Sequence, residues 1–375
     1  MKTQKEYNQC QQSISCHNCN SEHICQAWVN FVKRHNDTKS YAHFDLRISL
    51  SMPSVRKYVM DRAKVATHSF YPFIHFEKKN SRYGKKGLKK PRELYYCSHL
   101  DRCIYQRYAF LLNYKYNIWA RENDINDVAI AYRDNLGKNN IDFAKDAFDA
   151  ICRFPQCFVL VGDFTNFFDN LEHQYLKRMI CKVLDVERLP QDYFSVFKNI
   201  TRFSSWDWKD IVKAAGESIT ERGIRKKINS RDTILTKEQF QKSKDDIKKN
   251  VSGIGIPQGS PISAILSNIY MIEFDEKIKR YVKSKSGIYM RYSDDFIIVL
   301  PYEDDIEICN YKNFIFSHVE SMKGLIDLQK EKTSCYIYTN GKIYENNCLS
   351  SINYLGFLFD GKSTKIRPRA ITKSY

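Results

Sequence analysis

The chain has 375 residues, with 60 Lys or Arg against 43 Asp or Glu, so its formal net charge of +17 favours a polyanionic partner. This length allows two or three lobes with separate apolar cores. Because no apolar run approaches about 18 residues and residues 1–13 contain no apolar signal core, we expect a cytoplasmic protein without a membrane span, whose cysteines are reduced.

Residues 1–50 form a candidate N-terminal arm that is rich in cysteine. Cys16 and Cys19 have the short spacing of a zinc hook, and Cys10 and Cys25 would complete a set of four ligands. The outer spacings are unusual for a zinc site. We therefore favour a helical arm with reduced cysteines over zinc binding.

Two predicted strands, residues 71–79 and 91–97, flank a basic loop with glycines at residues 80–90. This pattern predicts a β-hairpin with a positive tip. Such a tip can grip phosphates, although a solvated loop is the commoner outcome. An apolar stripe from Ile104 to Tyr116, in steps of three and four residues, predicts a following helix that Asp101 would cap.

Residues 157–164 are a continuous apolar run that ends on a carboxylate, Asp163. The run predicts a strand buried on both faces. A lone carboxylate at its end is costly to bury unless it is paired or holds a metal ion. We expect a helix on each side of the strand, around residues 142–151 and from about Asn170.

A long insert follows at residues 186–250, with Trp206 and Trp208 and basic runs at 222–231 and 237–249. It lacks clear periodicity, so we expect it to be peripheral, helical and partly mobile. Basic runs of this kind are usually solvated faces and contact nucleic acid less often.

Residues 253–270 predict an irregular loop that leads into a helix. Glycines and a proline forbid regular structure up to Gly259, after which Ser260 suits an N-cap and Pro261 the first helical position. Gln258 would project from the loop. A flat ligand can approach such a glycine-lined backbone closely, because no Cβ stands in the way.

Residues 288–300 predict a β-hairpin whose tip carries adjacent carboxylates, Asp294 and Asp295. Two like charges on a tight turn repel, and flanking apolar strands hold them near a low-dielectric core. A divalent cation would offset that repulsion, and a solvated surface turn is the alternative.

Three elements close the chain. We expect a helix at residues 314–322, a turn and short strand ending on Lys332 at 324–333, and a last apolar hairpin element at 353–359.

These segments, in this order, resemble the reverse transcriptase family of palm polymerases over residues 71–359. The matching motifs are Tyr292-Ser-Asp-Asp295, Asp163 with Phe167-Phe168, Pro257-Gln-Gly259 with Ser260-Pro261 and Ser267-Asn268, Gly324-Leu325 with Lys332, and Tyr354-Leu-Gly-Phe357. Motif matches of this kind are hypotheses until the structural context agrees.

The resemblance implies an α+β fold of the right-hand polymerase type. Fingers would span residues 51–155, and the palm, an antiparallel sheet plus helices, would span 156–359 with the insert at about 186–250. The thumb would be short or absent, with 360–375 as its remnant or a tail.

The resemblance also implies a site for nucleotidyl transfer with two Mg²⁺ ions, or Mn²⁺ as the alternative. Asp163 and Asp294 would be the metal ligands, with Asp295 and the backbone carbonyl of Phe164 completing the set, and Lys332 would be a general acid. The implied nucleotide-binding residues are Arg92, Lys90 (or Lys78 or Lys79), Phe168, Gln258, Gly259 and Tyr292. Phe168 occupies the steric-gate position, with plain core packing as the alternative.

Within the family, residues 131–133 and the Ser-Pro and Ser-Asn pairs resemble the bacterial group II intron-like branch. Intron-encoded members carry a longer thumb than the 18 residues that follow Phe357, and the Val-Thr-Gly triplet of the retron type is missing, so the chain most resembles the defence-associated (antiphage) reverse transcriptases. We therefore expect an RNA-directed DNA polymerase that uses dNTPs and a structured non-coding RNA template, makes DNA, and works with a protein partner or a second copy but no membrane. Template-independent or protein-primed synthesis, an intron- or retron-type enzyme and a catalytically dead nucleic-acid-binding protein stay open as alternatives.

Overall fold

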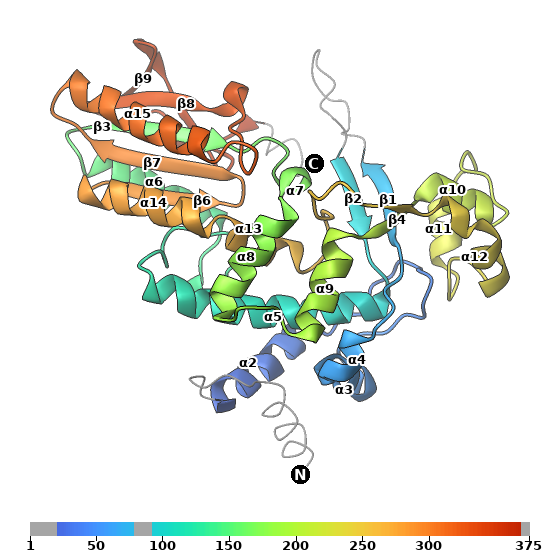
Figure 1. Ribbon diagram of the computed structural model, residues 1–375. Helices are drawn as coiled ribbons and strands as arrows, with labels where there is room; N and C mark the ends of the chain where they lie inside the picture. The colour runs from blue at the N-terminus through green and yellow to red at the C-terminus, as the bar shows by residue number, and fades with distance from the viewer. Residues whose placement is uncertain (1–20, 79–91, 369–375) are drawn as a thin grey trace. The chain divides into compact units, whose positions relative to one another are not determined.

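A computed structural model describes residues 21–78 and 92–368 (Figure 1). The chain divides into two compact units. The first contains the described residues up to Tyr114 together with Leu184–Ser263, and the second contains Lys115–Val183 and the described part of Ala264–Tyr375. The division into arm, fingers, palm and thumb is a functional one and stays a prediction.

The first unit contains a four-stranded sheet and short helices. The sheet order is β2 (Arg92–Tyr96), β1 (Phe73–Lys78), β4 (Ser204–Asp207), β5 (Lys248–Lys249). The helices are α2 (Ser21–Arg34), α3 (Pro53–Met60), α4 (Arg62–Ala66), the start of α5 (His99–Glu122), α9 (Gln191–Thr201), α10 (Trp208–Ala214), α11 (Ile224–Asn229), α12 (Lys237–Ser243) and the 3₁₀ turn η2 (Lys244–Asp246).

The predicted hairpin of the first unit is confirmed, since β1 and β2 pair antiparallel with Ile74 opposite Tyr96. The loop between these strands, which includes Lys79 and Lys90, lies outside the described residues. The same is true of Cys10, Cys16 and Cys19, whereas Cys25 is buried in α2.

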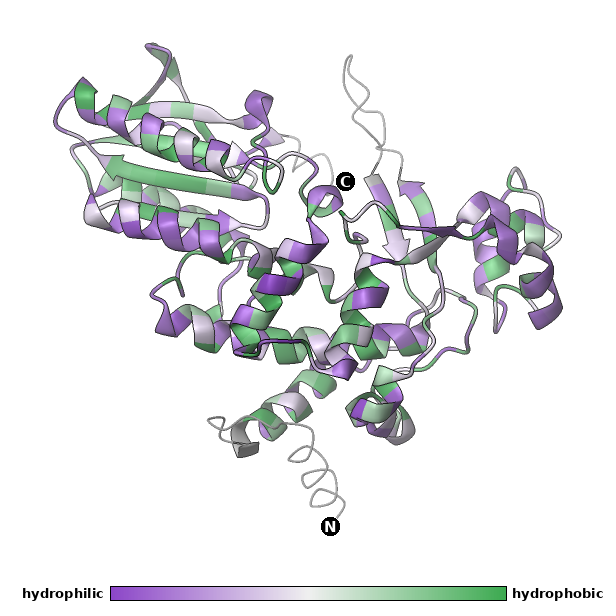
Figure 2. Ribbon diagram, in the orientation of Figure 1, coloured by the Kyte–Doolittle hydropathy of each residue, from purple (hydrophilic) through white to green (hydrophobic). Residues whose placement is uncertain are grey.

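The expectation of a peripheral insert is wrong for its central part. β4 pairs parallel with β1 and places Trp206 opposite Ile74, and Trp206 is fully buried. Trp208, Ile211 and residues of α11 complete an apolar core with Ile74. Sequence periodicity missed this core because its apolar residues come from several short helices and one short strand. The polar outer faces of α10, α11 and α12 are visible in Figure 2.

The prediction that Asp101 caps α5 is also wrong. Asp101 lies inside the first turn, where its buried carboxylate accepts hydrogen bonds from the Tyr71 backbone N–H at 2.9 Å and faces His68 Nε2 at 2.8 Å. The Ser98 hydroxyl instead accepts from the Asp101 N–H at 3.3 Å. The Asp101 carboxylate does not cap the helix because it binds His68 and Tyr71, which precede it in the chain.

The second unit is built on a six-stranded antiparallel sheet with the order β10 (Cys348–Ser350), β9 (Lys342–Glu345), β8 (Ser334–Thr339), β3 (Gln156–Asp163), β7 (Asp295–Pro301), β6 (Ile288–Tyr292). A separate three-stranded sheet contains β11 (Ile352–Tyr354), β12 (Phe357–Phe359) and β13 (Thr364–Ile366). The helices are α6 (Asn140–Cys152), α7 (Phe167–Asn170), α8 (His173–Leu184), α13 (Ser263–Tyr270), α14 (Ile272–Ser284) and α15 (Asp305–Ser321), with 3₁₀ turns η1 (Asp134–Leu136) and η3 (Lys330–Lys332).

Strand β3 lies at the centre of this sheet and is buried on both faces, as its apolar run predicts. Val159 and Val161 pack with residues of α6 on one face. Phe158 faces Tyr311 of α15 on the other. Figure 1 shows α14 and α15 lying over the sheet, and Figure 2 shows the apolar course of β7. Helices with antiparallel sheets confirm the predicted α+β class.

Three further predictions need correction, two of them near the chain's end. The helix predicted at 314–322 is α15, which starts much earlier, at Asp305, with the Asp304 carboxylate capping the Glu307 N–H at 2.9 Å. Residues 324–333 do not form a strand: Leu328 makes one isolated bridge to Phe164, and Lys332 ends the 3₁₀ turn η3. Ser260 is not an N-cap by its side chain, which is buried and has no hydrogen-bond partner within residues 21–78 and 92–368, and α13 begins at Ser263. Among the described helices, none is long and apolar enough to cross a membrane.

Candidate active site

Three carboxylate-bearing residues meet at one end of the central strands of the second unit. The β3–β7 register places Asp163 directly opposite Asp295, and the Phe164 N–H donates to the Asp294 carbonyl oxygen at 3.3 Å. Close packing at this point requires a glycine, since a Cβ on Gly162 would lie 2.4 Å from the Phe296 ring. Residues far apart in the sequence are therefore brought together by strand pairing.

A tight turn holds the two adjacent carboxylates. Tyr292 pairs with Asp295, which leaves Ser293 and Asp294 as the turn, and Ser293 has a φ of +62°. A positive φ is costly for a residue with a Cβ, so neighbouring contacts must hold it. The Ser293 carbonyl accepts a hydrogen bond from the Arg291 guanidinium at 2.8 Å.

Arg291 is itself held by a fully buried ion pair with Asp275 of α14. Arg291 Nη2 lies 2.6 Å from Asp275 Oδ2, and both side chains are completely buried. The Tyr289 hydroxyl donates to the same carboxylate at 2.7 Å. The Arg291 backbone bonds on both sides to residues 128–130, through Val128 O at 2.8 Å and the Ile130 N–H at 2.9 Å.

Lys332 reaches Asp163 from the segment that follows α15. The Gln329 N–H donates to the Asp163 carbonyl at 2.7 Å and the Thr165 N–H to the Asp327 carbonyl at 2.8 Å, so this segment runs beside the end of β3. The Lys332 ammonium forms an ion pair with Asp163 Oδ2. Asp163 Oδ1 is buried and has no hydrogen-bond partner among the described residues.

The electrostatics of the three carboxylates reflect their proximity. Burial, and after it the charge of Asp163, raises the pKa of Asp294. Burial together with the Asp294 and Asp163 charges raises the pKa of Asp295 to about 7, while Lys332 and Arg367 act in the opposite direction. This end of the sheet is therefore short of positive charge.

These residues fit a hard divalent cation. The donors are carboxylate oxygens, one of them an orphaned buried atom, and carboxylate and carbonyl oxygens are the ligands that Mg²⁺ prefers. Within residues 21–78 and 92–368, no three His, Cys, Asp or Glu side chains are gathered as metal ligands. Among these carboxylates, that of Asp163 is paired with the Lys332 ammonium.

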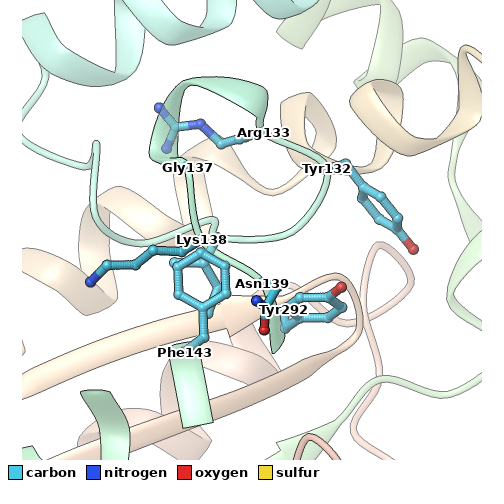
Figure 3. A pocket seen from close by; sticks show the side chains of 8 residues that line it. Tyr132, Arg133, Gly137, Lys138, Asn139, Phe143 and Tyr292 are labelled. Atoms are coloured by element: carbon cyan, nitrogen blue, oxygen red, sulfur yellow. The ribbon is translucent and has the colours of Figure 1, made fainter. Parts of the chain in front are cut away.

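The two predicted aromatic contacts of this site are partly exposed. Phe168 is half-buried in α7, whereas its neighbour Phe167 belongs to the buried set and lies 5.7 Å away between ring centroids. Tyr292 is half-buried and lines a cavity of about 380 Å³ with Tyr132 and Phe143 (Figure 3).

Other predicted nucleotide-binding residues lie in the first unit. Arg92 is the first residue of β2, opposite Lys78, and Lys90 lies outside the described residues. The Tyr95 N–H donates to the Gln258 carbonyl at 2.9 Å. Gly259 has a φ of +111°, and a Cβ there would lie 2.4 Å from the Tyr95 carbonyl oxygen. Only glycine therefore lets this loop lie against β2.

Sequence reasoning missed Asp275, Arg291 and Tyr132. The available signal for Arg291 was a charged residue inside an apolar strand, which is rare without a buried partner. The sequence does not indicate which carboxylate pairs with it, because Asp275 lies on a helix whose facing side depends on packing. Tyr132 carried no such signal.

Comparisons with known proteins give similarities in structure and in sequence. An apo telomerase from Candida tropicalis, truncated from its C-terminal domain, has a TM-score of 0.45 at 14% identity, covering 91% of this chain and 67% of that one. Telomerase from Candida albicans with a fragment of telomeric RNA has a TM-score of 0.46 at 14% identity, and the match covers 94% of this chain and 59% of that one. Structural similarities of this strength are too weak to assign function.

The sequence matches are more specific. The retron Ec86 reverse transcriptase of Escherichia coli is 33% identical over 78 residues, which is 21% of this chain and 23% of that protein. The match thus spans less than a quarter of the relative's length. Residues 78–359, about three quarters of the chain, match the family described as reverse transcriptase (RNA-dependent DNA polymerase). The chain belongs to the reverse transcriptase family.

Proposed function

We propose that the protein is an RNA-directed DNA polymerase that joins dNTPs at the carboxylates of the second unit. The observation that carries this proposal is the register of β3 and β7, which sets Asp163 opposite Asp295 and beside Asp294. Membership of the reverse transcriptase family supplies the reaction class.

Each residue at this end of the sheet has a proposed role. Asp163 and Asp294 would hold the divalent cations, with Asp295 and the Phe164 carbonyl as supporting ligands. Two bound Mg²⁺ ions would supply Lewis-acid stabilisation of the attacking and leaving oxygens. Lys332, already paired with Asp163, would donate a proton to the pyrophosphate leaving group.

The incoming nucleotide would be bound by the remaining predicted residues, Arg92, Lys90, Phe168, Gln258, Gly259 and Tyr292. Phe168 would act as a steric gate that rejects a 2′-hydroxyl. Its partial exposure supports this role over core packing, which Phe167 already provides.

A role in bacterial antiphage defence, with a structured non-coding RNA as template, is the finer part of the proposal. It is supported by the resemblance of residues 131–133 and the Ser-Pro and Ser-Asn pairs to the bacterial group II intron-like branch, among which the defence-associated class fits the chain best. A protein partner or a second copy would complete the assembly. Sequencing the RNA and DNA that copurify with the protein from phage-infected cells tests this part, and absence of an enriched RNA would contradict it.

Primer extension tests the polymerase proposal. The purified chain is given dNTPs, Mg²⁺ and a primer annealed to an RNA template of defined sequence. We expect a DNA product complementary to that template. A product of unrelated sequence, or one made equally well without template, would instead support template-independent synthesis, and DNA attached to protein would support protein priming. Absence of any product with intact nucleic-acid binding would support a dead polymerase.

A further inference from the structure

Apart from Tyr292, the residues that line the cavity beside it have no role in the proposed reaction. Its volume of about 380 Å³ falls in the range of about 300–1,000 Å³ that is typical of small-ligand sites. Its walls come from residues 130–133, the N-terminal end of α6, and Tyr292 of β6 (Figure 3). Tyr292 lies one residue before the acidic turn.

Tyr132 has a strained backbone and an exposed ring at the edge of this cavity. Its φ is +62°, and 47% of its surface is exposed, although it is a large aromatic residue. Strain of this kind costs of order 1–3 kcal/mol and persists only where the surroundings enforce it, often at ligand sites. The ring itself gains little from burial here, so packing does not explain the conformation.

The residues on both sides of Tyr132 are fixed. The Asn268 side chain donates to the Ala131 carbonyl at 3.0 Å. The buried Arg133 guanidinium donates to Asn117 Oδ1 at 2.8 Å, Ala129 O at 3.1 Å and Asn126 Oδ1 at 2.6 Å. These bonds hold the loop so that Tyr132 stays beside Tyr292.

The charged and amide side chains of the cavity already have partners. Arg133 is engaged as described, Lys138 pairs with Asp146 at 2.6 Å, and Asn139 accepts from the Ile141 N–H at 2.8 Å. The cavity therefore offers a ligand mainly the rings of Tyr132, Tyr292 and Phe143. Recognition mainly by aromatic rings suits a flat nucleobase and depends little on which base it is.

The two tyrosine rings would have to move apart and become more nearly parallel to stack on both faces of a planar guest. Their centroids are 6.3 Å apart with an interplanar angle of 45°. A stacked guest needs about 3.5 Å on each face, or about 7 Å between the rings. Because Tyr132 is exposed, a small rotation of its ring would open this gap without disturbing the core.

We propose that Tyr132 and Tyr292 form a clamp that stacks on one unpaired nucleobase next to the acidic turn, with Phe143 as the floor of the pocket. The inference deepens the proposed function and rests on it for the source of the base, which is a template base, a primer base or the base of a free nucleotide. The clamp would hold this base in one position relative to the acidic turn.

Base stacking can be measured without catalysis. The full chain is mixed with template–primer in Ca²⁺, and 2-aminopurine is placed at successive template positions, at the primer end, or added as the free triphosphate. These three placements are the arms of the experiment, and we expect the 2-aminopurine fluorescence to be quenched in one of them. The arm that responds identifies the source of the base.

Four variants separate stacking from folding. Tyr132→Phe keeps the ring and should keep the fluorescence quench. Tyr132→Ala should lose the quench, and if the base belongs to the template or primer it should also lower the affinity for template–primer about tenfold. Tyr132→Gly removes the ring but also relieves the positive φ, so it should lose the quench while melting no lower than wild type. Phe316→Ala, which removes an exposed ring of α15 away from the cavity, is the matched control and should behave as wild type.

Primer extension is measured in parallel. Two results would overturn the clamp and leave the polymerase proposal intact. In one, the wild type extends primers but 2-aminopurine is quenched nowhere; in the other, Tyr132→Gly retains the quench. Absence of both extension and template–primer binding would overturn the polymerase and the clamp together. A quench that requires the Tyr132 ring supports the clamp.

Discussion

At the scale of single residues, the ion pair of Lys332 with Asp163 links the proposed proton donor to a candidate metal ligand. Replacing Lys332 by Ala removes the donor and leaves Asp163 without its cationic partner. We expect the rate of single-turnover primer extension to fall about 100-fold, the lower end of general-acid effects, with little change in dNTP affinity.

Lys332→Arg is the comparison for that prediction. Arginine keeps the positive charge beside Asp163 but does not give up a proton at neutral pH. If charge alone matters, Lys332→Arg will extend primers as fast as the wild type. If the general-acid role is right, both variants will be slow, and a fast Lys332→Ala variant would contradict any role.

A second residue-scale prediction concerns pH and stability in the first unit. His43 is fully buried, accepts from the Phe44 N–H at 2.9 Å, and burial lowers its pKa to about 3. The unfolded chain, with an ordinary pKa near 6.5, binds a proton that the folded chain refuses. Falling pH therefore favours unfolding below about pH 6.5, by about 2 kcal/mol between pH 7 and pH 5.

Urea denaturation at several pH values measures this effect. His43→Asn offers a neutral acceptor and should remove the contribution, so the difference between wild type and variant should shrink or reverse as pH falls. Curves that stay parallel from pH 7 to pH 5 would show that His43 does not titrate as predicted.

At the scale of elements, the Arg291–Asp275 pair joins α14 to the strand that ends in the acidic turn. Arg291→Met leaves the buried Asp275 carboxylate without its cationic partner and should cost about 3–5 kcal/mol of unfolding free energy. The double variant with Asp275→Leu should recover most of that loss, because no lone charge stays buried. Chemical denaturation of Arg291→Met, Asp275→Leu and the double variant measures the coupling energy between the two side chains. Losses in the single variants that add up to the loss in the double variant would contradict this coupling.

The double variant also tests the position of the turn. It lacks the Arg291 donor to the Ser293 carbonyl, which is held at a positive φ. We therefore expect a slower extension rate even where stability is recovered, whereas full activity would show that the turn holds its shape without this bond.

Sequence reasoning predicted the elements with a strong local pattern and missed what depends on packing. The apolar run of β3 and the hairpin of β6 and β7 carry their signal in consecutive residues, so these strands and the carboxylates at their ends were predicted. The core around Trp206, the partner of Arg291 and the conformation of Tyr132 depend on contacts between distant segments. No local pattern records such contacts.

At the scale of the whole molecule, the net charge of +17 predicts salt-sensitive binding of template–primer. If about four phosphates are neutralised, affinity should fall about 100-fold between 50 and 200 mM salt through counterion release. Fluorescence anisotropy of a labelled template–primer across this range gives the slope. An affinity that does not change with salt would mean that the basic residues do not contact the nucleic acid.

The central claim is that Asp163, Asp294 and Asp295 together support cation-dependent DNA synthesis. The most direct measurement compares primer extension on an RNA template by wild type, Asp163→Asn, Asp294→Asn and the exposed control Asp149→Asn, each across a Mg²⁺ titration. We predict that the two active-site variants lose about 1,000-fold in rate at every Mg²⁺ concentration, while the control matches wild type. Extension at the wild-type rate by either active-site variant would contradict the account.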